Sequence, residues 1–437
     1  MKKLILTIGF AIWVMATNAQ QADARIGELL NKSDWFSLEE EYPVLKDSVQ
    51  SAYLRLLAET MIAHNFNQPG KAMECIGRLL AQHQQEMDIV TITRLVSLAA
   101  SIDGEMGNCA SAADQLKNFT DQLKVAGITD ELESLTELYN YYNQMRNLPV
   151  PVLSRPETDV EIPITIQKVK LPTSIEKKGW RGTHILIPVR VHGKNYRFIF
   201  DTGAGMTYFS ERFAKEIGVR VVHDSLLING GTAGAAYGKM GFLDSLQVGG
   251  MTMRNIKVIV APPNKMDDIL QIDAILGIDF MTLAGEFQIY PKKKKLLFPA
   301  QPTSLPATGR NLMFSDKLPL LKAFSGSDRL IFIFDTGCTL AAFYYPYYQK
   351  YKEQLDARGV KESGIGGGFN LVQEKEALFI PSVSFKIGDT AVEMKDVGVE
   401  VIPGTTGTTL DGILGMSLVN LYKKVTVNLT DMFVEVE

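Results

Sequence analysis

The same six residues, Phe-Ile-Phe-Asp-Thr-Gly, occur twice in the 437-residue chain, over 198–203 and over 332–337. Each copy ends an apolar run rich in β-branched and aromatic residues, a pattern that predicts a buried strand. Each strand would then end in a carboxylate, and burying a lone carboxylate is costly. The simplest reason to do so twice is that Asp201 and Asp335 face each other and work as a pair.

A pair of carboxylates has a definite chemical use. Two such groups a hydrogen bond apart cannot both ionise cheaply, so they share one proton. The ionised partner can take a proton from a bound water, and the protonated partner can donate to a carbonyl oxygen as charge develops there. Asp201 and Asp335 are therefore a candidate pair for acid–base chemistry, and the family resemblance given below implies that they are the catalytic residues.

The repetition extends to the elements that must position this pair. After each copy the chain contains an Asp-x-Ile-Leu-Gly segment, 273–277 in one half and 411–415 in the other. Matching apolar segments lie in between, and both halves close with a predicted hairpin, over 287–298 and over 425–436. We interpret this self-similarity as an internal duplication that forms two homologous lobes.

Two Asp-Thr-Gly motifs, each followed by an apolar-apolar-Gly segment, resemble the aspartic peptidase superfamily of the pepsin and retropepsin type. The resemblance covers about residues 182–437. It implies an all-β, bilobal, acid-protease-like catalytic unit, with lobes over 159–300 and 301–437, in which one chain supplies both aspartates. It also implies an aspartic-type endopeptidase with a peptide or protein substrate and no cofactor. A shared proton is a known property of aspartic proteases rather than a deduction from this sequence.

The resemblance also assigns supporting roles to the neighbours of the two aspartates. Thr202 and Thr336 would hydrogen-bond across the interface between the lobes. Gly203 and Gly337 would let backbone N–H groups approach the carboxylates. The Ile-Leu-Gly segments would pack beneath the two loops, a role compatible with an ordinary place in the core. Two unrelated Asx-type turns, the alternative interpretation, do not explain the coordinated repeat.

Two residues depart from the pepsin pattern. Pepsin-like enzymes usually carry Ser or Thr directly after the glycine, where this chain has Ala204 and Cys338. Retroviral enzymes carry alanine there. Losing donors disfavours the charged form of a carboxyl group, which predicts an activity optimum less acidic than that of pepsin. We interpret Cys338 as a small buried filler rather than a nucleophile, since no histidine is near it in sequence.

A flap is expected to cover the cleft between the lobes. The stretch 229–238 is rich in Gly and Ala and permits close approach to a substrate strand. Its candidate substrate-binding residues are Gly230, Gly231 and Tyr237. Tyr237 is either a flap tyrosine of the pepsin type or an exposed hairpin aromatic. The Gly-rich stretch 364–369 is either a second flap, as in the retroviral dimer, or a simple turn.

Residues 20–148 differ in character, because apolar residues recur there at helical spacing. They predict an all-α domain of helical hairpins, loosely similar to tetratricopeptide-type repeats, with turn signals at 67–70, 103–104 and 126–127. A Pro-rich linker over 149–158 follows. The fold class is therefore multidomain α and β. The helical domain could bind a protein partner, present substrate, act as a prosegment or only support the first lobe.

Residues 1–19 have the features of a secretory signal, with two lysines, an apolar core and small residues before Gln20. The apolar core is too short for a comfortable membrane span. We expect an exported protein, periplasmic or extracellular, without a stable span after signal removal; an uncleaved signal anchor is the alternative. A net charge of −4 gives no electrostatic case for binding nucleic acid.

Other residue types suggest no further site. The five histidines lack metal-ligand spacing, so no metal site is predicted. An exported chain would permit a Cys75–Cys109 disulfide, which the sequence does not decide. Two other classes of function stay open: an inactive peptide- or glycan-binding protein on the same fold, and a scaffold that binds partners through its helices. Both aspartates favour the enzyme, since a binder has no need to keep two carboxylates in repulsion.

Overall fold

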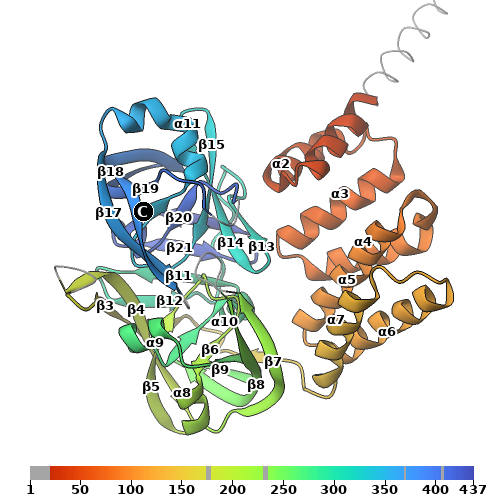
Figure 1. Cartoon of the computed structure of the whole chain (residues 1–437), viewed down its shortest axis with the longest axis horizontal. Helices are drawn as coiled ribbons and strands as arrows, with labels where there is room; N and C mark the ends of the chain where they lie inside the picture. Colours follow the sequence, from red (N-terminus) through yellow and green to blue (C-terminus); the bar gives the residue numbers. More distant parts are fainter. Residues whose placement is uncertain (1–19, 174–178, 230–234, 369–370, 405–407) are drawn as a thin grey trace, which may run out of the picture. The chain divides into compact units, whose positions relative to one another are not determined.

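The structure is a computed structural model of the chain and describes residues 20–437, except 174–178, 230–234, 369–370 and 405–407. The predicted signal sequence therefore lies outside the described residues. The chain divides into two compact units, Met1–Leu148 and Pro149–Glu437 (Figure 1). The first is helical where it is described, and the second is built mainly of strands, which confirms the predicted combination of α and β domains.

The helical unit consists of short antiparallel helices joined by tight turns (Figure 1). Neighbours in sequence pack together, α3 on α4 and α5 on α6, around a core of small and branched apolar residues. Besides a helix over residues 20–31 and the 3₁₀ turn η1 (Gln84–Glu86), the helices are α2 (Trp35–Leu45), α3 (Ala52–Asn65), α4 (Pro69–Gln82), α5 (Ile89–Glu105), α6 (Cys109–Val125) and α7 (Leu132–Gln144).

One of the predicted turns is wrong. Helix α5 continues through Asp103 and Gly104 to Glu105. Position 104 can hold only glycine, because a Cβ there would lie 2.0 Å from the ring of Tyr142. Asp103 is buried and accepts hydrogen bonds from Ser111 and from Gln115 of the next helix. Asp-Gly normally signals a turn, but here packing between helices overrides that preference.

The first lobe is one twisted, mainly antiparallel sheet with short helices at its margins (Figure 1). Its helices are α8 (Glu211–Glu216), α9 (Lys265–Leu270) and α10 (Ile278–Ala284). Its strands are β1 (Val152–Ser154), β3 (Thr165–Lys170), β4 (Trp180–Val191), β5 (Lys194–Phe200), β6 (Tyr208–Ser210), β7 (Arg220–Asn229), β8 (Ala235–Val248), β9 (Met251–Ala261) and β10 (Ala274–Leu276).

The second lobe follows the same plan. Its strands are β13 (Leu312–Ser315), β14 (Leu318–Ser325), β15 (Asp328–Phe334), β16 (Ala342–Phe343), β17 (Val360–Gly368), β18 (Leu371–Ile387), β19 (Thr390–Glu400) and β20 (Gly412–Leu414). Helix α11 (Tyr345–Asp356) packs against β18 and β19, and the one-turn helix α12 (Met416–Val419) follows β20.

A separate sheet joins the two lobes. The predicted hairpins form it as β11 (Glu286–Tyr290) with β12 (Lys295–Phe298) and β21 (Val425–Asn428) with β22 (Phe433–Val436). The hairpins meet edge to edge through β11 and β21, and β2 (Val160–Pro163) adds to the outer side of β12. This bridging sheet buries a carboxylate, Glu286, which accepts from Thr303 and Asn428 and is thus satisfied as burial demands.

The segment expected as a linker is held within the β unit. Residues 152–154 pair with β9 as strand β1. Arg155 donates from its guanidinium to the carbonyl oxygens of Ala284, Phe298 and Pro299. Proline content predicted an extended backbone, which is what a short edge strand also requires. A linker and an edge strand differ only in whether a neighbouring strand is available to pair with the segment.

Candidate active site

The two Asp-Thr-Gly loops begin where β5 and β15 end. Each strand is held on one side by a parallel neighbour, β10 beside β5 and β20 beside β15. The N–H of Asp201 donates to Leu276 at 3.1 Å, and that of Asp335 donates to Leu414 at 3.0 Å. The Ile-Leu-Gly segments therefore lie directly against both loops. The bend from strand to loop occurs at the same point in each lobe.

Buried phenylalanines fix the ends of these strands. Phe198, Phe200, Phe332 and Phe334 are fully buried. Edge-to-face packing orients them, as between Phe200 and Phe287 with ring centroids 5.0 Å apart. Close-packed aromatic rings leave little room for either strand end to move. The Phe-Ile-Phe part of the repeat therefore explains why the following carboxylates have defined positions.

Two threonines connect the loops across the interface between the lobes. The N–H of Thr202 donates to Thr336 Oγ1, and the N–H of Thr336 donates to Thr202 Oγ1, both at 3.0 Å. Each hydroxyl also donates across the interface, Thr202 to the carbonyl of Phe334 and Thr336 to that of Phe200, both at 2.8 Å. All of these groups are buried. This closed ring of four hydrogen bonds joins the loops as one body.

Each aspartate accepts two backbone hydrogen bonds from its own loop. Gly203 and Ala204 donate to Asp201 Oδ1 at 2.7 and 3.2 Å. Gly337 and Cys338 donate to Asp335 Oδ1 at 2.7 and 3.0 Å. These donors stabilise the ionised form of either carboxyl group.

The glycines allow the two carboxylates to meet. A Cβ on Gly203 would lie 2.5 Å from Asp335 Oδ1, and a Cβ on Gly337 would lie 2.2 Å from Asp201 Oδ2. Each glycine therefore packs directly against the carboxylate of the opposite lobe, with no space for any side chain. The two carboxyl groups are therefore close enough for Asp201 to influence the pKa of Asp335.

The pair is electrostatically coupled. Burial raises the pKa of Asp335 well above its usual range, and the nearby charge and hydrogen bond of Asp201 raise it further. The N–H groups of Gly337 and Cys338 act in the opposite direction but do not overcome this. The pair consequently shares one proton at a pH where an isolated carboxyl group would have lost it.

Residues 187–280 match the profile of a family described as "Aspartyl protease". The chain is related to the aspartic peptidase superfamily. The matched segment runs from β4 to α10 and contains Asp201, Thr202, Gly203 and the first Ile-Leu-Gly segment. No curated protein sequence matches the chain.

Solved structures of similar shape include two plant seed proteins and one bacterial protease. Basic 7S globulin from soybean is 10% identical with a TM-score of 0.39, covering 64% of this chain and 94% of its own. Conglutin gamma, a basic 7S globulin from lupine seeds, is 10% identical with a TM-score of 0.39, covering 63% and 94%. A retropepsin-like aspartic protease from Rickettsia conorii is 18% identical with a TM-score of 0.21, covering 34% and 91%.

The residue after each glycine supplies only its backbone to the two aspartates. The thiol of Cys338 donates to the carbonyl of Leu340 at 2.9 Å and makes no bond to a carboxylate. Burial raises the pKa of this thiol to about 12, with a further contribution from the charge of Asp335. Cys338 is thus a protonated thiol, which agrees with its interpretation as a filler. The other two cysteines, Cys75 and Cys109, are buried and free, so they form no disulfide.

Sequence analysis missed a second layer beneath the loops. The carboxylate of Asp279 accepts from the N–H of Thr207 at 3.0 Å and from its hydroxyl at 2.9 Å. At the equivalent place in the second lobe, Ser417 Oγ accepts from the N–H of Ala341 at 2.7 Å. Both acceptors stand two residues after an Ile-Leu-Gly glycine. That shared offset is a signal that a longer self-alignment would have found.

Sequence analysis also missed His184. This residue lies on β4 and is only 8% exposed. Its Nε2 lies 2.9 Å from the carbonyl oxygen of Gly337, in the loop of the opposite lobe. Screening the histidines for metal spacing could not detect a partner that is a backbone carbonyl 153 residues away. The described residues contain no cluster of His, Cys, Asp and Glu that could hold a metal ion.

Both lobes carry a long hairpin of the kind expected for a flap. In the first lobe β7 and β8 pair as far as Asn229 and Ala235, so Gly230 and Gly231 lie outside the described residues. Tyr237 is on this hairpin, and its side chain is 70% exposed. In the second lobe β17 and β18 pair continuously from Val360 to Gly368. The Gly-rich stretch is therefore the arm of a hairpin rather than a simple turn, and the binding roles of these residues stay predictions.

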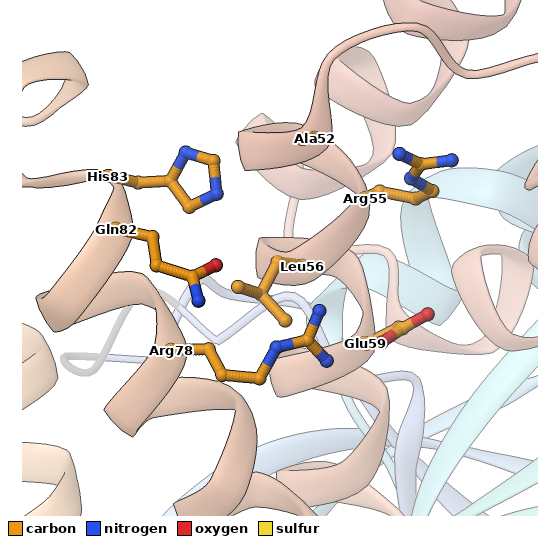
Figure 2. Close-up of a pocket in the computed structure, with 7 residues that line it drawn as sticks. All are labelled: Ala52, Arg55, Leu56, Glu59, Arg78, Gln82 and His83. Atoms are coloured by element: carbon orange, nitrogen blue, oxygen red, sulfur yellow. The ribbon is translucent and has the colours of Figure 1, made fainter.

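The helical unit has a hollow of its own, of about 160 Å³, between α3 and α4 (Figure 2). Figure 2 shows Arg78 and Gln82 of α4 facing Leu56 and Glu59 of α3. The Glu59 carboxylate is fixed by the Tyr42 hydroxyl, which donates to it at 2.7 Å. Arg55 also lines the hollow. Within the described chain, neither Arg55 nor Arg78 forms an ion pair. No helix in the described residues is long and apolar enough to cross a membrane.

Proposed function

We propose that the chain is an aspartic endopeptidase that hydrolyses peptide bonds by general acid–base activation of water between Asp201 and Asp335. The observation that carries this proposal is that each carboxyl group packs against the glycine of the opposite loop, so that the two groups lie together inside a cage of backbone donors from both lobes. Such contact raises the free energy of the doubly ionised pair. Shared-proton chemistry offsets that cost, whereas a binding protein would gain nothing from it.

The unequal carboxyl groups suggest how the roles are divided. In this proposal Asp201 takes a proton from a water held between the two groups. That water attacks the peptide carbon while Asp335 donates its proton to the carbonyl oxygen. The resulting tetrahedral species then loses the amine, which leaves with a proton returned by the pair. Each step moves a proton between groups that are already in hydrogen-bonding contact, so little rearrangement is required.

The substrate class follows from the same geometry. Strand hairpins from both lobes, β7–β8 and β17–β18, supply free backbone edges to which an extended peptide could pair as an added strand. Alternate side chains of such a peptide point to opposite sides and would be read by different pockets. An extended peptide of several residues, rather than a compact small molecule, therefore suits the site.

The first test is cleavage of a mixed peptide library by the full chain from acidic to neutral pH. Wild type is compared with Asp201→Asn and with wild type plus a statine-type inhibitor, which imitates the tetrahedral species. Cleavage that is lost in the variant and blocked by the inhibitor would support the dyad. Tight inhibitor binding without cleavage at any pH would favour the inactive peptide-binding protein instead.

We also propose that the enzyme is exported, on the basis of residues 1–19. N-terminal sequencing of the protein from its native host tests this directly. A mature protein that begins at Gln20 would support export through a cleaved signal. Retention of Met1 would support the signal-anchor alternative or an internal location.

The hollow in the helical unit favours a role in docking a protein partner. Arg55 and Arg78 outnumber the single carboxylate of Glu59, so the hollow suits an acidic segment of a protein substrate. Reversing both arginines to glutamate should slow cleavage of a folded protein substrate and leave a short peptide unaffected. The control reverses two lysines of the same unit that do not line the hollow, Lys71 and Lys124. Equal effects of both double variants on both substrates would contradict the proposal.

A further inference from the structure

The start of strand β4 lies along the second Asp-Thr-Gly loop. Gly182 has a φ of +64°, and a Cβ there would lie 2.6 Å from the carbonyl oxygen of Thr339. Thr183 Oγ1 accepts from the side-chain amide of Asn420 at 2.9 Å. His184 follows with its contact to Gly337. Three successive residues of the first lobe therefore contact the second lobe, and only the histidine reaches the peptide next to a catalytic candidate.

The register counterpart of His184 in the other lobe is not a histidine. Leu186 is the partner of Ile199 in the first lobe, and Leu320 is the partner of Ile333 in the second. Both isoleucines stand two residues before an aspartate, so the register makes Leu318 the counterpart of His184. A leucine side chain has no hydrogen-bond donor. The histidine therefore distinguishes the loop of Asp335 from the loop of Asp201.

The chemistry of the contact fixes the state of the imidazole. A carbonyl oxygen can only accept, so Nε2 carries the hydrogen and Nδ1 has the lone pair. Burial lowers the pKa of His184, although the negative charge of Asp201 and the Gly337 carbonyl both act to raise it. The ring is thus a neutral donor at neutral pH. The charged groups near the imidazole are the carboxyl groups of Asp201 and Asp335. Arg181, on the same strand as His184, influences the thiol of Cys338.

The Gly337 carbonyl and the N–H of Cys338 belong to one planar peptide group, and that N–H contacts Asp335. Peptide groups are planar, and the structure has no cis peptide bond among the described residues, so this carbonyl and the N–H of Cys338 point in opposite directions. The Cys338 N–H donates to Asp335 Oδ1 at 3.0 Å. Whatever holds the carbonyl also aims the N–H. Glycine rotates easily about its backbone bonds, so this peptide needs an anchor that the residue itself does not supply.

We propose that His184 is a positioning residue of the active site: it holds the Gly337–Cys338 peptide so that its N–H stays directed at Asp335. This inference rests on the proposed function for its catalytic meaning but not for its geometry. Donation from the imidazole also polarises the peptide, which strengthens the N–H as a donor to the ionised form of Asp335. His184 therefore keeps the protonated partner able to release its proton.

Three variants test this. His184→Leu places in the first lobe the residue that the second lobe uses, and so removes the donor with little change in packing. His184→Gln retains an N–H donor at a similar reach and should restore much of the wild-type behaviour. His192→Gln, in the exposed turn between β4 and β5, is the control for losing a histidine at the end of these strands away from the two carboxyl groups.

The main readout is the ¹³C NMR titration of aspartate carboxyl carbons in the full-length protein, with the Asp335 signal assigned by its loss in Asp335→Asn. We expect the apparent pKa of the pair to move upward in His184→Leu, to return toward wild type in His184→Gln and to stay unchanged in His192→Gln. In turnover, His184→Leu should lower kcat roughly tenfold to a hundredfold with little change in KM. The basic limb of the pH profile should move in the same direction as the titration.

The two proposals fail in different ways. An unchanged titration in His184→Leu, or a shift that His184→Gln does not reduce at all, would overturn the positioning role even if the enzyme is active. A shifted titration in a protein that cleaves no peptide would uphold the positioning role and overturn the proposed activity. A variant that loses its near-UV circular dichroism is replaced in the comparison by His184→Gln, which preserves the polar contact.

Discussion

The two lobes hold their aspartates with the same backbone contacts but with different supporting side chains. In both loops the glycine N–H lies 2.7 Å from its aspartate and the threonines exchange bonds of equal length. One layer further out, Asp279 supports the first loop where Ser417 supports the second. His184 contacts the second loop, whereas its register counterpart Leu318 has no donor to offer the first.

The aspartates that precede the Ile-Leu-Gly segments show the same divergence. Asp273 accepts from the Ser210 hydroxyl at 3.0 Å and pairs with Arg212 at the surface. Its counterpart Asp411 is only 1% exposed and pairs with Lys350 at 2.6 Å. The close approach of the two carboxyl groups constrains the backbone donors around them. The next layer needs only one hydrogen-bond acceptor behind each loop. A symmetric cage of backbone donors is therefore surrounded by unequal second layers.

The largest expected effect is the loss of cleavage when either aspartate is replaced, and it should be similar for the two lobes. Asp201→Asn and Asp335→Asn should each reduce cleavage by on the order of 10²–10⁴-fold, because either change removes the shared proton. Peptide cleavage is measured beside circular dichroism to show that both variants fold. Full activity in either folded variant would mean that the two carboxyl groups do not act together.

The threonine ring should also respond symmetrically. Thr202→Val and Thr336→Val each leave a buried N–H without its acceptor, at a cost of about 1–3 kcal/mol in the free energy of unfolding. Thr120→Val is the control, since its buried hydroxyl bonds only within helix α6 to Leu116. Denaturant unfolding measures all three. A loss in one lobe alone would show that the ring is not shared.

The ion pairs should respond unequally. Lys350→Met leaves the buried carboxylate of Asp411 with only the N–H of Ile331 as a described donor, so unfolding free energy should fall by about 1–3 kcal/mol. Arg212→Met at the exposed pair should change it by less than about 0.5 kcal/mol. Chemical denaturation of the two variants compares them. Equal losses would contradict the assigned difference in burial.

The coupled pair predicts a pH dependence of stability. The pKa of Asp335 is raised in the folded state, so the unfolded chain releases this proton more readily as pH increases. The contribution of Asp335 to stability is present below its unfolded pKa and is lost as pH rises through its folded pKa. Asp335→Asn should remove this loss, so its melting temperature should exceed that of wild type more at neutral pH than at acidic pH. Calorimetry across pH measures both, and a constant difference would exclude the coupling.

The smallest expected effect is a shift of the pH optimum. Cys338→Ser supplies a hydroxyl donor beside Asp335, and Ala204→Ser supplies one beside Asp201. Either donor stabilises a carboxylate and should move the pH–rate profile toward acid, with little change in the maximal rate. Profiles of kcat/KM for the two variants and wild type provide the measurement. A shift toward alkaline pH would refute the explanation offered for the missing hydroxyl groups.

The sequence predicted those parts of the site that depend on local pattern. Strand ends at Asp201 and Asp335 followed from the repeated apolar run, and the structure places both residues as a pair. His184 and the sheet that joins the lobes could not be predicted in this way, because their contacts link segments more than a hundred residues apart. The turn predicted at Gly104 failed for a related reason, since the space it gives to Tyr142 depends on a distant helix.

The bridging sheet also determines when the site can form. Strands β11 and β21 belong to different lobes, and Glu286 bonds to Asn428 across 142 residues of chain. Loop closure over such a distance makes this pairing a slow, late event in folding. Until it occurs, each lobe carries a single aspartate with no partner. The proposed activity would therefore appear only with this last assembly step.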